Sequence, residues 1–440
     1  MGIFSKFFEQ KRKSSDPELQ FGRYTDTYKT DDKYKSWDIA IEHFENEKYL
    51  VSYTHFLDFL KSDSHQNVSY TTENGKILFS IYQGSKLISG EADFKKCKAE
   101  AKIVKTKKLP LGLMRQLLEE NFDLRYTRYT IDDDDCISLK FDTFVEDGSP
   151  HKIYQALKEL ATEADRKDDL LMDTFEGLEP INNNHTRPIS DNEKKIKYHF
   201  FKKWCDNVLH EIDLGKLNPF LYPGGISFLI LDFLYKTDYL IKPEGKVMEQ
   251  IREGHDLFFN ESLLTVHEKN KILIKMVRDL EKVTAESLAK ELYEVNSTFG
   301  TSMPEGHQRL VDIIDAQMTD FDWYYENKFH TFANAICGYV AGFSLFAYSL
   351  PEPSKALLKL FYMITENKYF NELGFNEEYY LNDVFYPKNI HQAIKYIITD
   401  NKEKYPGIQV DNRYLQYDDL PTFSRSFLQM ITNMQYPEYL

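Results

Sequence analysis

The most direct candidates for metal chemistry in this sequence are a carboxylate and an imidazole four residues apart. Glu326 and His330 would lie on one face of a helix, where two such side chains can share a metal ion. A diiron site needs further carboxylate–histidine pairs on facing helices, and the sequence offers no persuasive set. The pairs His210-Glu211 and His267-Glu268 lack the second histidine of a zinc-protease motif. We therefore predict no metal and no cofactor, and we interpret these histidines as solvated or core residues.

Two further stretches share some features with ligand-binding motifs. Asp132–Asp135 is a run of four carboxylates, but it lacks the alternating ligands, the glycine and the final glutamate of an EF-hand loop. Gly224-Gly225 precedes an apolar helix, yet the lysine of a phosphate-binding P-loop is missing. We interpret the first as a solvent-facing turn and the second as the start of a helix.

No catalytic residues are predicted, because neither a GxSxG motif nor a paired cysteine–histidine arrangement occurs. Catalytic residues scattered along the chain would leave no such motif. An enzyme with an unrecognised site in the helical region or in a cleft between domains is therefore the alternative to a binding protein.

The composition favours a folded protein that does not bind nucleic acid. Of the 440 residues, 42% are hydrophobic and 15% are aromatic, a proportion typical of chains with a packed core. The 55 basic residues are outnumbered by 70 acidic ones, which gives a net charge of −15. Lysine and arginine form no continuous stripe, so phosphates would be repelled.

Cysteine usage predicts a reducing compartment. Cys97, Cys136, Cys205 and Cys337 are far apart and show no ligand spacing, so we expect reduced, structural thiols in a cytoplasmic protein. The start of the chain lacks a continuous apolar core and a small-residue cleavage site. We therefore expect no secretory signal peptide.

The clearest structural pattern is a β-hairpin around the acidic run. Residues 122–146 predict strand, loop and strand, with Ile131 facing Cys136 across the loop. In this register a mostly apolar face is backed by a mostly polar face, which carries Tyr129 and Phe144. Aromatic side chains among polar neighbours suit a protein contact, so we predict Tyr129 and Phe144 as binding residues.

A helix follows the hairpin, and we expect it to cover the apolar face. Ser149 is a favourable N-cap, and Pro150 fits the first helical position. The apolar residues behind them recur at spacings of three and four, as on one face of a helix. These residues are Ile153, Leu157, Leu160, Ala161 and Ala164.

The residues before the hairpin predict a pair of helices followed by further strands. Residues 37–61 resemble a single tetratricopeptide unit, and no second copy occurs. Asn74-Gly75 is a strong signal for a two-residue turn between strands. Alternation through residues 97–103 predicts another half-buried strand, and Pro110 opens a helix that leads to the hairpin.

The order of elements over residues 36–172 resembles the type III secretion chaperone-like fold, in particular the YbjN-like family. The run from Leu124 to Leu160, with strand, acidic turn, strand and helix, carries most of this resemblance. The resemblance implies an antiparallel sheet with helices on one face, a protein-binding role, often dimerisation, and no catalytic centre. A protein partner and a homodimer are expected on this basis.

Composition divides the chain into a tail, a linker and two domains. We predict a tail over residues 1–35, an α+β domain over 36–175, a linker over 176–191 and an α-helical domain over 192–440. The fold class is therefore α+β, with an antiparallel sheet followed by a larger all-α domain. A protease cut in the linker should release two folded fragments.

Two apolar stretches bear on membrane contact. Phe332–Leu350 has no charged residue and contains a GxxxG spacing, but its polar residues and short length favour a buried helix with close packing. Phe4, Phe7 and Phe8 would line one side of a short helix, so the N-terminal tail is the one place where membrane contact is considered. The plainer interpretation of that tail is a frayed end.

These patterns favour a cytoplasmic adaptor or chaperone-like protein that acts through contacts with other proteins. Nucleic acid is excluded as a partner by charge, and no cofactor is expected.

Overall fold

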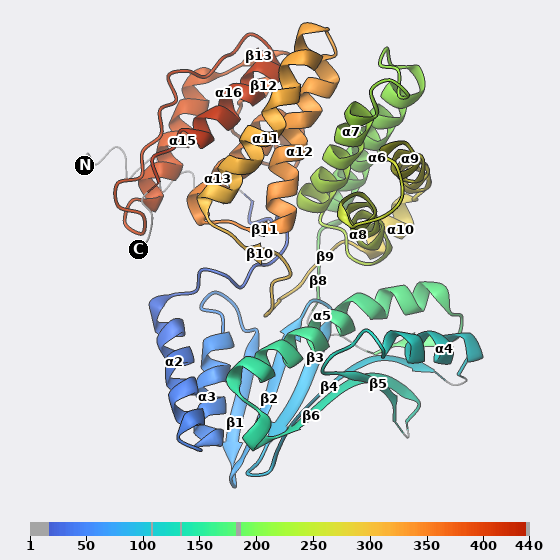
Figure 1. Ribbon diagram of the computed structural model, residues 1–440, viewed down its shortest axis with the longest axis vertical. Coiled ribbons are helices and arrows are strands. Elements are labelled where there is room, and N and C mark those ends of the chain that lie inside the picture. The colour runs from blue at the N-terminus through green and yellow to red at the C-terminus, as the bar shows by residue number, and fades with distance from the viewer. Residues whose placement is uncertain (1–16, 107–108, 133, 182–185, 437–440) are drawn as a thin grey trace. The chain divides into compact units, whose positions relative to one another are not determined.

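The computed structural model describes residues 17–106, 109–132, 134–181 and 186–436, and it confirms the α+β class (Figure 1). The chain forms two compact units that exchange segments. The sheet unit comprises Tyr24–Pro188 and Tyr293–Thr301. The described part of the helical unit comprises residues 17–23, 189–292 and 302–436.

A seven-stranded antiparallel sheet forms the centre of the sheet unit. Its strand order is β1-β2-β3-β4-β6-β5, and β7 pairs with β4. The strands are β1 (Val68–Glu73), β2 (Lys76–Gln83), β3 (Lys86–Ala92), β4 (Lys96–Thr106), β5 (Arg128–Ile131), β6 (Cys136–Phe144) and β7 (Leu178–Pro180). The predicted turn joins β1 to β2, because Asn74 and Gly75 adopt the φ angles of 51° and 74° that a two-residue hairpin requires.

Helices cover one face of this sheet. They are α2 (Asp31–Glu45), α3 (Tyr49–Leu60), α4 (Leu111–Glu120) and α5 (Pro150–Thr174), with the short turn η1 (Val145–Asp147) before α5. Figure 1 shows α5 running across the sheet. Its predicted apolar stripe is buried, since Ile153, Leu157 and Leu160 are at most 2% exposed. The predicted N-cap is also confirmed, because Ser149 Oγ accepts a hydrogen bond from Lys152 N at 3.3 Å.

The predicted register of the β5–β6 hairpin is wrong by one residue. Ile131 pairs with Ile137 instead of Cys136, and Tyr129 pairs with Leu139. The cause is the acidic loop, where Asp132 N donates to Cys136 O at 3.0 Å and so extends the ladder by one pair. Asp135, just before β6, adopts a left-handed φ of 59°. The strand β5 is also shorter than expected, because it begins at Arg128.

Helices form nearly all of the helical unit. The α-helices are α6 (Asp191–Leu214), α7 (Pro223–Lys236), α8 (Gly245–Phe259), α9 (Val266–Glu281), α10 (Ala285–Lys290), α11 (His307–Glu326), α12 (His330–Ala347), α13 (Glu352–Thr365), α14 (Asn367–Glu372), α15 (Pro387–Asn401) and α16 (Leu420–Thr432). A π-helical turn, η2 (Thr237–Ile241), extends α7. Two short pairs join β10 (Met303–Pro304) to β11 (Tyr348–Ser349) and β12 (Tyr380–Leu381) to β13 (Val384–Phe385).

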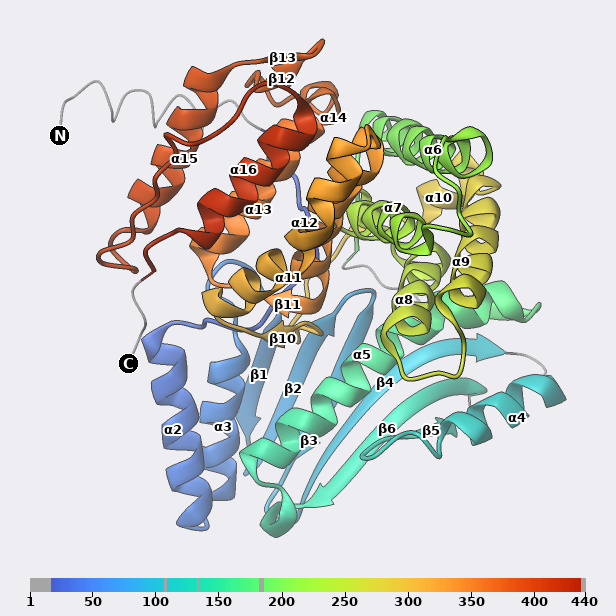
Figure 2. The same cartoon turned by 45° about the horizontal axis from the view of Figure 1, so that its top comes forward.

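The helix α12 is the buried central helix that its sequence predicts, and Figure 2 shows it between α7 and α16. Its glycines allow α7 to approach closely. A Cβ atom on Gly338 would lie 2.1 Å from Asp232 Oδ1, and one on Gly342 would lie 2.7 Å from Tyr235 Cβ. Within the described residues, no helix combines the length and apolar character needed to cross a membrane.

The two units exchange segments that are distant in sequence. Phe21, near the start of the described chain, packs in the helical unit against Phe370, with ring centroids 5.2 Å apart. Arg23 forms an ion pair there with Asp238, with Nε and Oδ1 2.6 Å apart. In the opposite direction, residues 293–301 leave the helical region and belong to the sheet unit.

The boundaries of the units therefore differ from those expected from composition. The stretch expected as a linker contains β7, where Leu178 is 8% exposed in the sheet core. It also contains β8 (Arg187–Pro188), which pairs with β9 (Tyr293–Glu294). Within the region expected to be all helical, α10 ends at Lys290 and the chain continues as the strand β9. Phe4, Phe7 and Phe8 lie outside the described residues.

Candidate functional site: a clasp around residues 293–301

The structure places the two predicted binding residues on opposite faces of the sheet. Tyr129 lies beside Leu139 on the helix-covered face, where 8% of its surface is exposed. Phe144 lies on the other face and is 47% exposed. Because side chains alternate between faces along a strand, the error of one residue in register moves Tyr129 into the core. The two residues do not form one binding surface.

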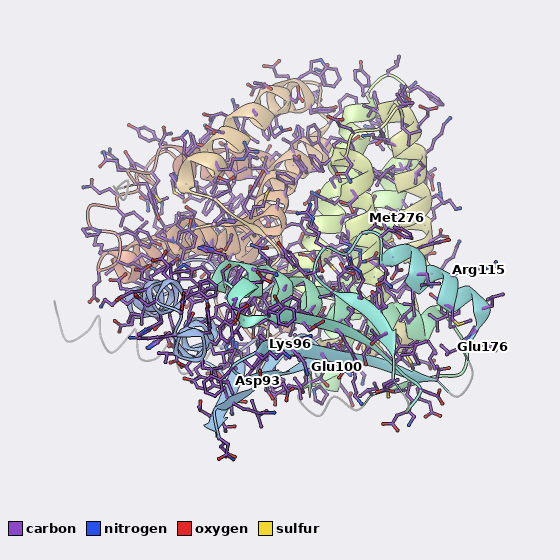
Figure 3. All side chains as sticks on the ribbon, turned by 60° about the horizontal axis from the view of Figure 1, so that its bottom comes forward. Asp93, Lys96, Glu100, Arg115, Glu176 and Met276 are labelled. Atoms are coloured by element: carbon purple, nitrogen blue, oxygen red, sulfur yellow. The ribbon has the colours of Figure 1, made fainter. Side chains whose placement is uncertain are left out.

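The face that carries Phe144 is exposed, and we call it the open face. Figure 3 labels Lys96 and Glu100 on β4, which both belong to it, and Asp93 at the turn before β4. Ion pairs connect side chains on this side of the sheet at N–O distances of 2.8–3.5 Å: Lys96–Asp142, Lys98–Glu91, Lys140–Glu100 and Lys102–Asp132. Two large apolar side chains, Leu78 at 50% and Phe144 at 47% exposure, lie among these charges. Such exposed pairs contribute little stability individually, so replacing them by other contacts costs little.

The sheet unit also contains a group of residues that enclose residues 293–301. We call this group the clasp, and it consists of Asn67, Tyr82, Gln83, Gly84 and Tyr154. The first four come together because β1 and β2 are paired, and Tyr82 N donates to Asn67 O at 2.8 Å. Asn67 and Gln83 are 1% and 5% exposed. Buried amide side chains of this kind need hydrogen-bond partners.

The amide of Gln83 binds the backbone of the enclosed segment. Its Oε1 accepts hydrogen bonds from Thr298 N at 3.1 Å and from Phe299 N at 2.9 Å. Its Nε2 donates to Phe299 O at 3.2 Å. Beside it, Gly84 N donates to Asn296 O at 3.1 Å, as a neighbouring strand would. Four backbone groups of the segment are therefore bound by one side chain and one strand end.

The hydroxyl of Thr298 is bound in both of its hydrogen-bonding roles. Thr298 Oγ1 accepts from Asn67 Nδ2 at 3.0 Å and donates to Tyr82 O at 2.8 Å. Asn67 is held in place by its other bonds, since its Oδ1 accepts from Ser62 N at 2.7 Å and its Nδ2 also donates to Leu60 O at 3.0 Å. Thr298 itself has no exposed surface. A residue without a hydroxyl here would leave the buried Asn67 donor with one partner fewer.

Phe299 and Gly300 are enclosed by neighbouring side chains and backbone. Phe299 is 1% exposed, and its ring centroid lies 5.5 Å from that of Tyr154, edge to face. Burial, and secondarily the negative charge of Asp26, raises the pKa of Tyr154, whose hydroxyl donates to Asp26. A Cβ atom on Gly300 would lie 2.8 Å from Asp26 N and 3.0 Å from Thr25 Cα, so only glycine fits without moving that backbone.

The residues considered for metal chemistry are not arranged for it. Glu326 ends α11 and His330 begins α12, so the prediction of one continuous helical face is wrong. Lys328 breaks the helix between them with a left-handed φ of 64°. Among the described residues, no group of three or more histidine, cysteine or carboxylate side chains is positioned to hold a metal ion.

The cysteines and Gly225, which belong to the remaining motif candidates, lie in packed parts of the structure. All four cysteines are buried, and burial raises the pKa of Cys97 and Cys205 to about 12, which keeps both as thiols. Gly225 lies in the first turn of α7, as expected, and its missing Cβ makes room for Leu217 and Tyr324.

The clasp could not be recognised from the sequence, because Asn67 and Gln83 bind residues more than 200 positions away. The local signal was the run Asn296-Ser297-Thr298-Phe299-Gly300, whose first three residues and glycine are poor helix formers. It indicates an interruption of the helical pattern in this part of the chain. It does not reveal which part of the chain binds the segment.

No protein-family model matches this chain, and no curated protein is significantly similar to it.

Proposed function

We propose that this chain is a cytoplasmic protein-binding adaptor, with the sheet unit as a chaperone-like contact module. The observation that supports this most strongly is the open face, which presents Leu78 and Phe144 as accessible apolar side chains among paired charges. The partner is another protein or a second copy of this chain, as the resemblance to chaperone-like domains implies.

The open face has the physical character of a protein-binding surface. Leu78 faces Glu91, Glu91 faces Lys98, and Lys98 faces Asp142 across successive strands, so the apolar side chain continues into a row of alternating charges. The ammonium group of Lys96 lies 5.0 Å above the ring of Phe144. A partner can bury Phe144 and Leu78 and exchange these exposed ion pairs for contacts of its own.

The test is a paired substitution on the open face, Leu78→Ser with Phe144→Ser. Both side chains are about half exposed, so circular dichroism and the melting temperature should change little. Capture of a stoichiometric partner by the immobilised chain, followed by mass spectrometry, should weaken about tenfold or more if these side chains are anchors. Light scattering of the purified chain distinguishes a second copy from a different protein.

A matched control is available in the helical unit. Leu263 and Leu264 are 104% and 39% exposed, so Leu263→Ser with Leu264→Ser makes an equivalent loss of exposed apolar surface elsewhere. The partner should be retained by this variant. Equal capture by wild type and by both variants would reject the open face as the contact surface.

A further inference from the structure

The segment held by the clasp has the contacts of a bound peptide. Residues 293–301 are joined at both ends to the helical unit, yet their contacts belong to the sheet unit. The segment begins with β9, which pairs with β8, and then bridges to Gly84 through Asn296. It is short, it pairs with other segments at residues 293–294 and 296, it bends at Thr298 and Phe299, and residues distant in sequence enclose it.

Part of the recognition does not depend on sequence. Gln83 offers both a carbonyl and an N–H to the segment, with bonds of 2.9–3.2 Å to Thr298 and Phe299. Its side-chain amide thus replaces the peptide group of a neighbouring strand. These bonds involve only backbone atoms of the segment, which bends at Thr298 and Phe299 so that both N–H groups reach the same oxygen; they therefore do not depend on which side chains the segment carries.

Three consecutive positions depend on side-chain identity. Asn67 and the carbonyl of Tyr82 require a hydroxyl at Thr298. The apolar seat beside Tyr154 accepts the ring of Phe299, which loses nearly all its exposure. The backbone of Thr25 and Asp26 excludes any side chain at Gly300. The clasp therefore selects a residue with a hydroxyl group, an aromatic residue and a glycine, in this order.

We propose that the clasp is a sequence-selective peptide-binding site and that residues 293–301 are its internal ligand. Its ligand class is a short peptide with a threonine or serine, an aromatic residue and a glycine in succession, which bends at the first two of these residues as the internal segment does. This inference deepens the proposed protein-binding function, on which it rests, by naming a peptide class that a partner could present. A partner segment of this class would bind by displacing the internal one.

The experiment weakens the binding of the internal segment to the clasp and adds the peptide as a separate molecule. The full chain carrying Thr298→Ala with Phe299→Ala is titrated with a fluorescent nine-residue peptide that has the sequence of residues 293–301. We expect saturable binding by anisotropy and a melting temperature that rises with peptide concentration. The clasp of the wild-type chain is already occupied by residues 293–301, so the wild-type chain should bind the same peptide with an affinity at least about tenfold lower.

Control peptides test the selectivity. Replacing the peptide's phenylalanine by alanine, or its glycine by alanine, should each weaken binding about tenfold or more, because the seat is left empty or the backbone at Thr25 is forced aside. Adding Gln83→Ala to the chain should also abolish binding. No saturable binding to the folded variant, or equal binding of all peptides, would overturn the proposal.

A second variant covers the case in which the double substitution prevents folding. Gly300→Ala strains the internal ligand without emptying the seat of Phe299, and the unmodified peptide should then displace it. Failure of displacement in this variant overturns the proposal. The chain with Leu78→Ser and Phe144→Ser should still bind the peptide after the clasp is freed, so loss of peptide binding and loss of open-face capture are separate results.

Discussion

At the scale of single residues, buried polar side chains connect segments that local sequence patterns leave unrelated. Gln83 and Asn67 act in this way in the clasp. Glu159 on α5 does the same for the segment before β5. Its carboxylate accepts hydrogen bonds from the backbone N–H groups of three consecutive residues, 125–127, each at 2.9 Å, and from the hydroxyl of Thr127.

Glu159 should make the stability of the sheet unit dependent on pH in the acidic range. Burial acts to raise the pKa of Glu159, but the hydrogen bonds from Arg125, Tyr126 and Thr127 outweigh it and lower the pKa below its usual value. A lowered pKa in the folded state means that the ionised form stabilises the fold at neutral pH. That contribution is lost as the pH falls through the folded pKa.

The measurement compares melting temperatures of wild type and Glu159→Gln between pH 3 and 7, a range chosen to span ordinary carboxyl pKa values of about 4. Wild type should melt higher near neutrality, and the difference should shrink toward the acidic end. A difference that stays constant across this range would show that the charge of Glu159 is not the stabilising feature.

At the scale of elements, the register of the β5–β6 hairpin and the close contact of α7 with α12 have different structural origins. The register of β5 and β6 agrees with the conformation of the acidic loop, where Asp132 N donates to Cys136 O and Asp132 Oδ1 accepts from Cys136 N. The close contact of α7 and α12 depends on the absence of a side chain at Gly338, where Asp232 occupies the space. The GxxxG spacing in α12 therefore supports packing between helices inside the helical unit.

Gly338→Ala should destabilise the helical unit by about 1–3 kcal/mol, the usual cost of inserting a methyl group into a packed interface. The added Cβ would meet Asp232 Oδ1 at 2.1 Å. Gly224→Ala is the matched control in the first turn of α7, where a Cβ would meet nothing within 4 Å. It should leave the unfolding free energy unchanged or raise it by up to about 1 kcal/mol. Denaturant unfolding measures both, and equal effects would contradict the packing argument.

At the scale of the whole molecule, the exchange of segments links the folding of the two units. Residues 17–23 belong to the helical unit although residues 24–188 belong to the sheet unit. Residues 293–301 belong to the sheet unit although the sequence on both sides belongs to the helical unit. Each unit therefore needs chain from both sides of the stretch expected to be a linker.

A single cut at a protease site introduced between Asn182 and His185 should not separate the fragments, contrary to the expectation from composition. The N-terminal fragment would keep Phe21 and Arg23 packed in the helical unit, and the C-terminal fragment would keep Phe299 in the sheet core. Gel filtration after the cut should give one peak, which splits only in denaturant. Two separate, folded fragments under native conditions would show that the exchanged segments contribute little.

The sequence by itself determined the elements whose signals are local. The hairpin turn at Asn74-Gly75, the cap at Ser149, the apolar stripe of α5 and the helical character of residues 191–432 all depend on neighbours within a few positions. The α+β class was predicted from these signals and is confirmed. The burial of α12 was also predicted correctly, because an uncharged helix with small residues packs well inside a protein.

Tertiary structure decided the features that depend on long-range contacts. The face on which Tyr129 lies depends on the register of the whole hairpin, because alternation along a strand turns a shift of one residue into a change of face. The clasp brings Gln83 to Phe299 across 216 positions of sequence. No propensity or spacing encodes such a contact, since it forms only when the sheet, α5 and the returning segment are packed together.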